Sequence, residues 1–337
     1  MFRVILLAIA ISISSCGDGQ KEPQSTKQMI NGITFVATSK PIDSTAIKPL
    51  KVKYSASHAA VIPYASMRDL HSPEIVYNHD RGWWGEKIEG ATKTIAMMHE
   101  QDIAVMLKPQ VWIWHGEYTG HIKLDTEEQW QQLETTYESY IMTFARLAQD
   151  TNVELFCVGT ELESFIAARP AYWNNLINKI KTVYKGKLTY ASNWDSYALV
   201  PFWEQLDYIG VDAYFPMCDL KTPSVTNAAA SWEKWKGDLS SLSRKRNKPI
   251  LFTEYGYISA DYAGVEPWKD AQEGHEVNEE AQRILLETMY NEVWHEDWFA
   301  GGYLWKHHTE FGRRGLEKQF TTQDKIAEAV VKKQYSK

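Results

Sequence analysis

Two glutamates each stand shortly after an apolar run that has the length of a β-strand. Glu161 follows residues 155–158, and Glu254 follows residues 250–252. Two carboxyl groups that face one substrate can hydrolyse a glycosidic bond, because a protonated one supplies a proton to the leaving oxygen while an ionised one attacks the anomeric carbon. The plainer alternative is that each glutamate pairs with a lysine or arginine. For two glutamates at matched strand ends, we favour the catalytic interpretation.

Eight apolar runs of strand length alternate with longer stretches of helical spacing. The strand-like runs are residues 33–37, 59–64, 103–107, 155–158, 188–191, 208–211, 250–252 and 302–304, and the clearest helical stretches are 126–148, 171–183, 228–243 and 279–294. Strands that alternate with helices form a parallel sheet, and eight such strands close into a barrel. The sequence therefore predicts the α/β class, with a single-domain (β/α)8 TIM barrel over residues 30–337. An open doubly wound sheet is the alternative, but residues 37–45 contain no glycine for its phosphate-binding turn.

The stretch 126–148 shows the helical pattern most clearly. Its apolar residues recur at intervals of three and four, which places them in one stripe. Asp125 just before it, with Glu127 and Glu128 in the first turn, suits the start of a helix.

The spacing of the two glutamates fits the barrel. They are 93 residues apart, which corresponds to three βα units in a barrel of roughly 250 residues and eight units. Their strands would then be the fourth and the seventh, nearly opposite each other. Because barrel enzymes react at the carboxyl ends of the strands, we expect both carboxylates to face one substrate, about 5 Å apart in a retaining enzyme.

The motifs around these glutamates carry a family resemblance. Gly159-Thr160-Glu161 and Thr253-Glu254-Tyr255-Gly256 resemble motifs of glycoside hydrolase clan A, and most closely family 113, whose described members are β-mannanases. Supporting segments are residues 107–110, 191–195, 212–215 and 301–305, and the resemblance covers roughly residues 30–311. It implies that Glu161 is the general acid/base and Glu254 the nucleophile of a retaining double displacement on β-1,4-linked mannan or manno-oligosaccharides.

Four further polar residues are candidates for contacts with the substrate or with the two glutamates. Tyr214 could donate a hydrogen bond to the nucleophile, or pack at the rim. Asn193 could contact a sugar hydroxyl or the acid/base, or belong to a turn. Lys108 could lower the pKa of the nucleophile or bind a hydroxyl, and its alternative is a solvated rim lysine. Glu163, which we place in the loop after the fourth strand, is the rival for the acid role and is interpreted as a substrate contact or a support for one.

Half of the 14 tryptophans fall in segments that follow strands, at positions 83, 84, 112, 114, 194, 268 and 305. Flat indoles bind the apolar faces of sugar rings. Trp305, at the end of the eighth strand, is the strongest candidate to stack under the sugar being cleaved, and we also expect Trp112 to bind substrate. For each tryptophan, the alternative is that it packs in the core or anchors a loop, and for every one except Trp305 we favour that alternative when it is taken singly. Together they favour an extended polysaccharide.

Several other classes of protein fit the sequence poorly. The net charge of −7, without a basic block, speaks against binding to nucleic acid. We expect no metal and no cofactor, since no zinc-ligand motif occurs, and a serine-hydrolase elbow is also missing. The open alternatives are a hydrolase of another β-glycan, such as glucan or galactan, and a non-catalytic carbohydrate-binding lipoprotein. We expect a monomer.

The N-terminus indicates export. Residues 1–15 combine Arg3 with an apolar run that is too short to span a bilayer, which is typical of a cleaved signal. Ser14 and Ser15 lead to Cys16 in a stretch that resembles a relaxed lipoprotein cleavage box. We therefore expect a lipid on Cys16, a polar tether over residues 16–29, and a bacterial lipoprotein at the outer membrane or cell surface.

Overall fold

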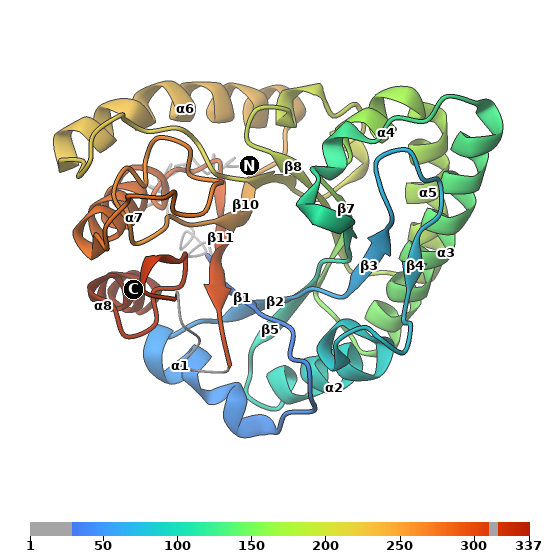
Figure 1. Cartoon of the computed structure of the whole chain (residues 1–337), viewed down its shortest axis with the longest axis horizontal. Coiled ribbons are helices and arrows are strands. Elements are labelled where there is room, and N and C mark those ends of the chain that lie inside the picture. Colours follow the sequence, from blue (N-terminus) through green and yellow to red (C-terminus); the bar gives the residue numbers. More distant parts are fainter. Residues whose placement is uncertain (1–28, 310–315) are drawn as a thin grey trace, which may run out of the picture.

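The chain closes into a parallel β-barrel that is surrounded by helices (Figure 1). The computed structural model describes residues 29–309 and 316–337. The barrel strands are β1 (Ile30–Phe35), β2 (His58–Val61), β5 (Ala104–Leu107), β7 (Leu155–Thr160), β8 (Lys187–Asn193), β9 (Ile209–Asp212), β10 (Ile250–Tyr255) and β11 (Phe299–His307). They pair in the order β1-β11-β10-β9-β8-β7-β5-β2, and β1 pairs with β2 to close the ring. The predicted (β/α)8 barrel is confirmed.

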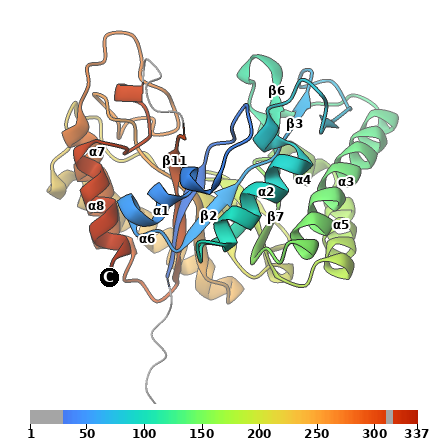
Figure 2. The ribbon, with the colours of Figure 1, turned by 90° about the horizontal axis from the view of Figure 1, so that it is seen from below.

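The helices form the outer layer, as both views show (Figures 1 and 2). They are α1 (Lys48–Tyr54), α2 (Ile88–His99), α3 (Glu127–Asp150), α4 (Glu163–Ala168), α5 (Pro170–Val183), α6 (Val225–Arg246), α7 (Glu279–Val293) and α8 (Ile326–Tyr335). In α3 the N-cap is Thr126 and not Asp125. The Thr126 side chain accepts from the amide of Gln129, whose side chain in turn accepts from the Thr126 amide, so that two otherwise unpaired donors are satisfied.

A small second sheet departs from the predicted strands. The run 59–64 is not one strand, because β2 ends at Val61 and β3 (Tyr64–Met67) leaves the barrel and pairs with β4 (Val76–Tyr77) and β6 (Gln110–Ile113). Pro63 and Pro109 precede β3 and β6, and a proline lacks the N–H that a continuing ladder needs. In Figure 2 this sheet stands above the barrel strands.

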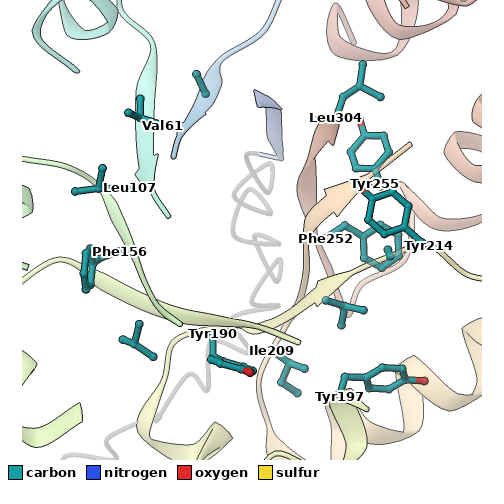
Figure 3. Packing of buried hydrophobic residues seen from close by; sticks show 14 of the residues in the cluster. Val61, Leu107, Phe156, Tyr190, Tyr197, Ile209, Tyr214, Phe252, Tyr255 and Leu304 are labelled. Atoms are coloured by element: carbon teal, nitrogen blue, oxygen red, sulfur yellow. The ribbon is translucent and has the colours of Figure 1, made fainter. Parts of the chain in front are cut away.

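Buried apolar side chains alternate between the two faces of the barrel wall. One set fills the interior and consists of Ile30, Ala60, Met106, Leu155, Tyr208, Leu251, Ala300 and Tyr303. Their neighbours Val61, Leu107, Phe156 and Phe252 belong to the layer under the helices, part of which Figure 3 shows. Apolar side chains fill the barrel interior, and the polar side chains of the candidate site lie at the carboxyl ends of the strands.

The N-terminal predictions concern residues that lie almost wholly outside the described part of the chain. The export signal, Cys16 and all but the last residue of the tether fall within residues 1–28. Among the described residues, no helix combines the length and apolar character needed to cross a membrane. Cys157 is buried as a core residue, and it forms no disulfide with Cys218.

Candidate active site

A cavity of about 770 Å³ opens at the carboxyl ends of the barrel strands, and Glu161 and Glu254 both line it. Glu161 directly follows β7, the fourth barrel strand along the chain, and Glu254 lies in β10, the seventh. Of the other expected site residues, those that line the same cavity are Trp112, Asn193, Tyr214 and Trp305. Polar and aromatic groups from six strands or strand ends thus surround the two carboxyl groups.

Glu161 sits in an environment that favours the protonated form of its carboxyl group. Burial, followed by the negative charges of Asp212 and Glu254, raises the pKa of Glu161 well above its usual range. A carboxyl group that is neutral at pH 7 can donate a proton. Its backbone is also unusual, with a φ of 49° in the left-handed region, which non-glycine residues rarely adopt and which is common at functional sites.

Glu254 is surrounded by donors. The Tyr214 hydroxyl donates to its Oε2 at 2.9 Å, and the Lys108 ammonium forms an ion pair with its Oε1. Its side chain is almost completely buried. An ionised carboxylate only accepts hydrogen bonds, so one donor on each oxygen suits that state and fixes the orientation of the group.

Lys108 forms a buried charge network with Glu254 and Asp212. It is fully buried, and its Nζ lies 3.2 Å from both oxygens of Asp212, which also accepts from Thr253 Oγ1 at 2.7 Å. Burial lowers the lysine pKa, but the charges of Asp212 and Glu254 outweigh this effect and raise it, so the ammonium stays charged. Burial and the charge of Glu254 raise the pKa of Asp212 to about 7. The expected alternative of a solvated rim lysine is wrong.

The remaining predicted contacts fall in different places. Asn193 donates to Asp195 Oδ1 at 3.0 Å beside the cavity. Glu163 is not in a loop, because α4 begins at this residue. One of its oxygens accepts from Ser196 Oγ at 2.8 Å, and the side chain packs against Gly120. It does not line the cavity of the two glutamates.

The tryptophans divide between the cavity and the rest of the molecule. Trp194 and Trp268, whose rings stack at 5.2 Å, line the cavity together with Trp112 and Trp305. Trp112 is 47% exposed and projects from β6. Trp84, in contrast, is buried. Four of the seven expected tryptophans therefore surround the site.

Some lining residues were not predicted from the sequence. Gln110 and Thr119 line the cavity, and Gln110 Oε1 is buried with no hydrogen-bond partner in the described part of the chain. Gln110 belongs to the segment after the third strand, so its position in the sequence was a usable signal. Thr119 lies in a short 3₁₀ turn, Thr119–His121, that no periodic pattern marks. Within residues 29–309 and 316–337, no group of three potential metal-binding side chains comes together.

A (β/α)8 barrel with two glutamates in one cavity, the pKa of one raised by burial and the other bound by donors on both oxygens, defines the site of a glycoside hydrolase. The family profile described as glycoside hydrolase family 113 matches residues 38–325. The chain belongs to glycoside hydrolase family 113, and it is a glycoside hydrolase.

Solved structures share the fold of this chain. The family 113 β-mannanase of Alicyclobacillus acidocaldarius, solved in complex with ManMIm, has 25% sequence identity and a TM-score of 0.80, and the match covers 91% of this chain and 97% of that one. A family 113 β-1,4-mannanase solved as a complex has 22% identity, a TM-score of 0.79 and coverages of 92% and 99%. A β-glucuronidase of Ruminococcus gnavus is more distant, at 14% identity and a TM-score of 0.64, with coverages of 92% and 50%. No curated protein sequence matches the chain.

Proposed function

We propose that this protein hydrolyses β-1,4-mannosidic bonds in mannan or manno-oligosaccharides with retention of configuration. The observation that carries the proposal is the contrast between two glutamates in one cavity: the pKa of Glu161 is raised by burial and by neighbouring carboxylates, whereas Glu254 accepts from donors on both oxygens. A proton donor and a nucleophile are the two groups that a retaining glycosidase requires.

In the first step, Glu254 attacks the anomeric carbon while Glu161 gives its proton to the glycosidic oxygen. The bond to the leaving sugar breaks and an ester to Glu254 forms. Esterification removes the negative charge of Glu254, which is one of the causes that raise the pKa of Glu161. The ionised Glu161 then takes a proton from water, whose oxygen displaces Glu254 and restores both carboxyl groups.

The walls of the cavity favour a neutral glycan. Its described lining includes the acidic side chains of Glu117 and Asp195 and no lysine or arginine. A glucuronide carries a carboxylate, which this acidic lining would repel. The family 113 structures bear the name β-mannanase, and mannan is a neutral polymer. Trp112 and Trp268, both partly exposed, offer surfaces for sugars beyond the cleaved bond.

The test is product analysis with the purified mature protein on defined manno- and gluco-oligosaccharides, with the anomer of the first product followed by NMR. We expect β-configured products from the mannosides only. Cleavage of the glucosides alone would assign another β-glycan, and binding without cleavage would assign a non-catalytic carbohydrate-binding lipoprotein. Release of α-configured products would contradict retention.

We also propose that the protein is exported and anchored through a lipid on Cys16, as a monomer at the outer membrane or cell surface. The support is the apolar segment before Cys16 and the polar segment after it. Metabolic labelling with a radioactive fatty acid should label the wild type and not Cys16→Ser. Light scattering on the unanchored protein tests the monomer.

A further inference from the structure

The left-handed backbone at Glu161 is held by hydrogen bonds on both sides of the residue. The Glu161 amide donates to the carbonyl of Ala191 at 2.9 Å. The next amide, of Leu162, donates to the hydroxyl of Tyr190 at 2.7 Å. The Glu161 carbonyl accepts from Thr119 Oγ1 at 2.8 Å. Since a φ of 49° is disfavoured for a residue with a side chain, these bonds select the conformation.

Two of these bonds come from β8, and the third comes from a separate segment. Ala191 and Tyr190 belong to the strand next to β7, where they are fixed by the barrel itself. Thr119 belongs to the 3₁₀ turn between β6 and α3 and lines the cavity, although its own side chain is buried. The hydrogen bond of Thr119 therefore links a turn in the wall of the cavity to the backbone of Glu161, the proposed acid.

The same turn has a second connection that does not involve Glu161. Ser164 Oγ, in α4, donates to the carbonyl of Gly120 at 2.6 Å. Gly120 has no space for a Cβ, because Glu163 Oε2 and the Tyr118 ring lie against it. The turn is thus fixed at two adjacent residues, and Ser164 provides a matched control for Thr119.

We propose that Thr119 is a positioning residue. By fixing the peptide between Glu161 and Leu162, it aims the carboxyl group of Glu161 at the glycosidic oxygen. This proposal rests on the proposed function. Loss of the Thr119 hydroxyl leaves the peptide between Glu161 and Leu162 held only through its N–H, which donates to Tyr190. The peptide can then tilt about that bond, and the carboxyl group of Glu161 shifts with it. Misplacement by about 1 Å can cost about 100-fold in rate.

The experiment uses a series of aryl β-mannobiosides. All carry the same mannobiose and differ only in the aryl leaving group, which ranges from phenol to 2,4-dinitrophenol. A poor leaving group needs the proton of Glu161, whereas dinitrophenolate leaves without it. For Thr119→Val, we expect kcat/KM on the phenyl substrate to fall about 10- to 100-fold, and on the dinitrophenyl substrate to stay within about threefold. In this variant, kcat/KM should therefore depend more steeply on the pKa of the leaving group than it does in the wild type. Thr119→Ser keeps the hydroxyl and should restore the wild-type pattern, and Ser164→Ala should show that pattern too.

The outcomes separate the two proposals. An equal fall on every substrate, an unchanged Thr119→Val, or a Ser164→Ala variant that matches Thr119→Val would overturn the positioning role alone. A wild type that cleaves no mannoside would overturn both. If Thr119→Val does not fold, Thr119→Ala carries the same expectation in a smaller side chain.

Discussion

Glu161 and Glu254 each follow a bulge in the strand that presents them. In β7, Cys157 is paired with Thr189 but Thr160 with Ala191, so three residue steps lie opposite two. In β10, the same irregularity separates Phe252 from Glu254, which lies beside Asp212. Strict alternation would turn Glu254 outward like Phe252. The bulge turns it into the barrel mouth, which is a known use of bulges next to active sites.

The two glutamates should be indispensable in different ways. We expect Glu254→Gln to lose all measurable turnover, because an amide cannot form the ester. Glu161→Gln should lose about 100- to 10,000-fold on mannotetraose but keep kcat/KM on a dinitrophenyl substrate. Initial rates measure both effects, and circular dichroism checks the fold. Full activity of either variant on mannotetraose would contradict the assignment of these two glutamates as catalytic residues.

The alkaline limb of the pH profile should follow Asp212. Glu161 must be protonated to act, so kcat/KM falls as the pH rises through its pKa. Burial and then the charge of Asp212 hold that pKa high. Asp212→Asn should therefore move the alkaline limb to lower pH. Glu163→Gln, whose charge makes the smallest contribution among the causes, is the control and should move the limb much less. A shift of the Asp212→Asn limb to higher pH would contradict this account.

Lys108 should contribute to the free energy of unfolding. Lys108→Met leaves Asp212 and Glu254 buried together without their cation. Breaking a buried ion pair on one side costs about 3–5 kcal/mol, so the free energy of unfolding in urea should fall by that amount. The exposed pair of Lys93 with Glu89 is a control, and Lys93→Met should change stability by less than about 1 kcal/mol. A stable Lys108→Met would mean that the network relaxes or protonates.

The Tyr214 hydroxyl should act on the rate more than on binding. Tyr214→Phe keeps the ring but removes one of the two donors to Glu254. We expect kcat to fall about 10- to 100-fold with a small change in KM, since charge-assisted hydrogen bonds contribute about 1.5–3 kcal/mol. Steady-state kinetics on mannotetraose measures this. A rise in KM at constant kcat would show that Tyr214 binds the sugar instead.

Trp112 should affect long substrates selectively. It is 47% exposed at the cavity wall, whereas Trp114 is 53% exposed and does not line the cavity. Trp112→Ala should lower kcat/KM on mannohexaose about 10-fold, the effect of losing a stacking contact of about 1.4 kcal/mol, and leave mannotriose almost unchanged. Trp114→Ala should change neither. Equal losses in both variants would indicate a structural role for these tryptophans.

The sequence by itself determined the barrel and the strand ends that carry the two glutamates. Apolar periodicity is local, so the runs before Glu161 and Glu254 were visible without tertiary structure. Strand breaks at Pro63 and Pro109 could have been predicted from the missing N–H groups, whereas the bulges could not, because they depend on pairing with β8 and β9.

Only the tertiary structure decided how the site is supported. Lys108 and Asp212 are 104 residues apart, and Thr119 and Glu161 are 42 apart. Such contacts leave no periodic trace, since each depends on the closure of the barrel and on the path of a loop. The same holds for the raised pKa of Glu161, which arises from burial and from charges on other strands. Local patterns place residues on elements, and packing decides which of them meet.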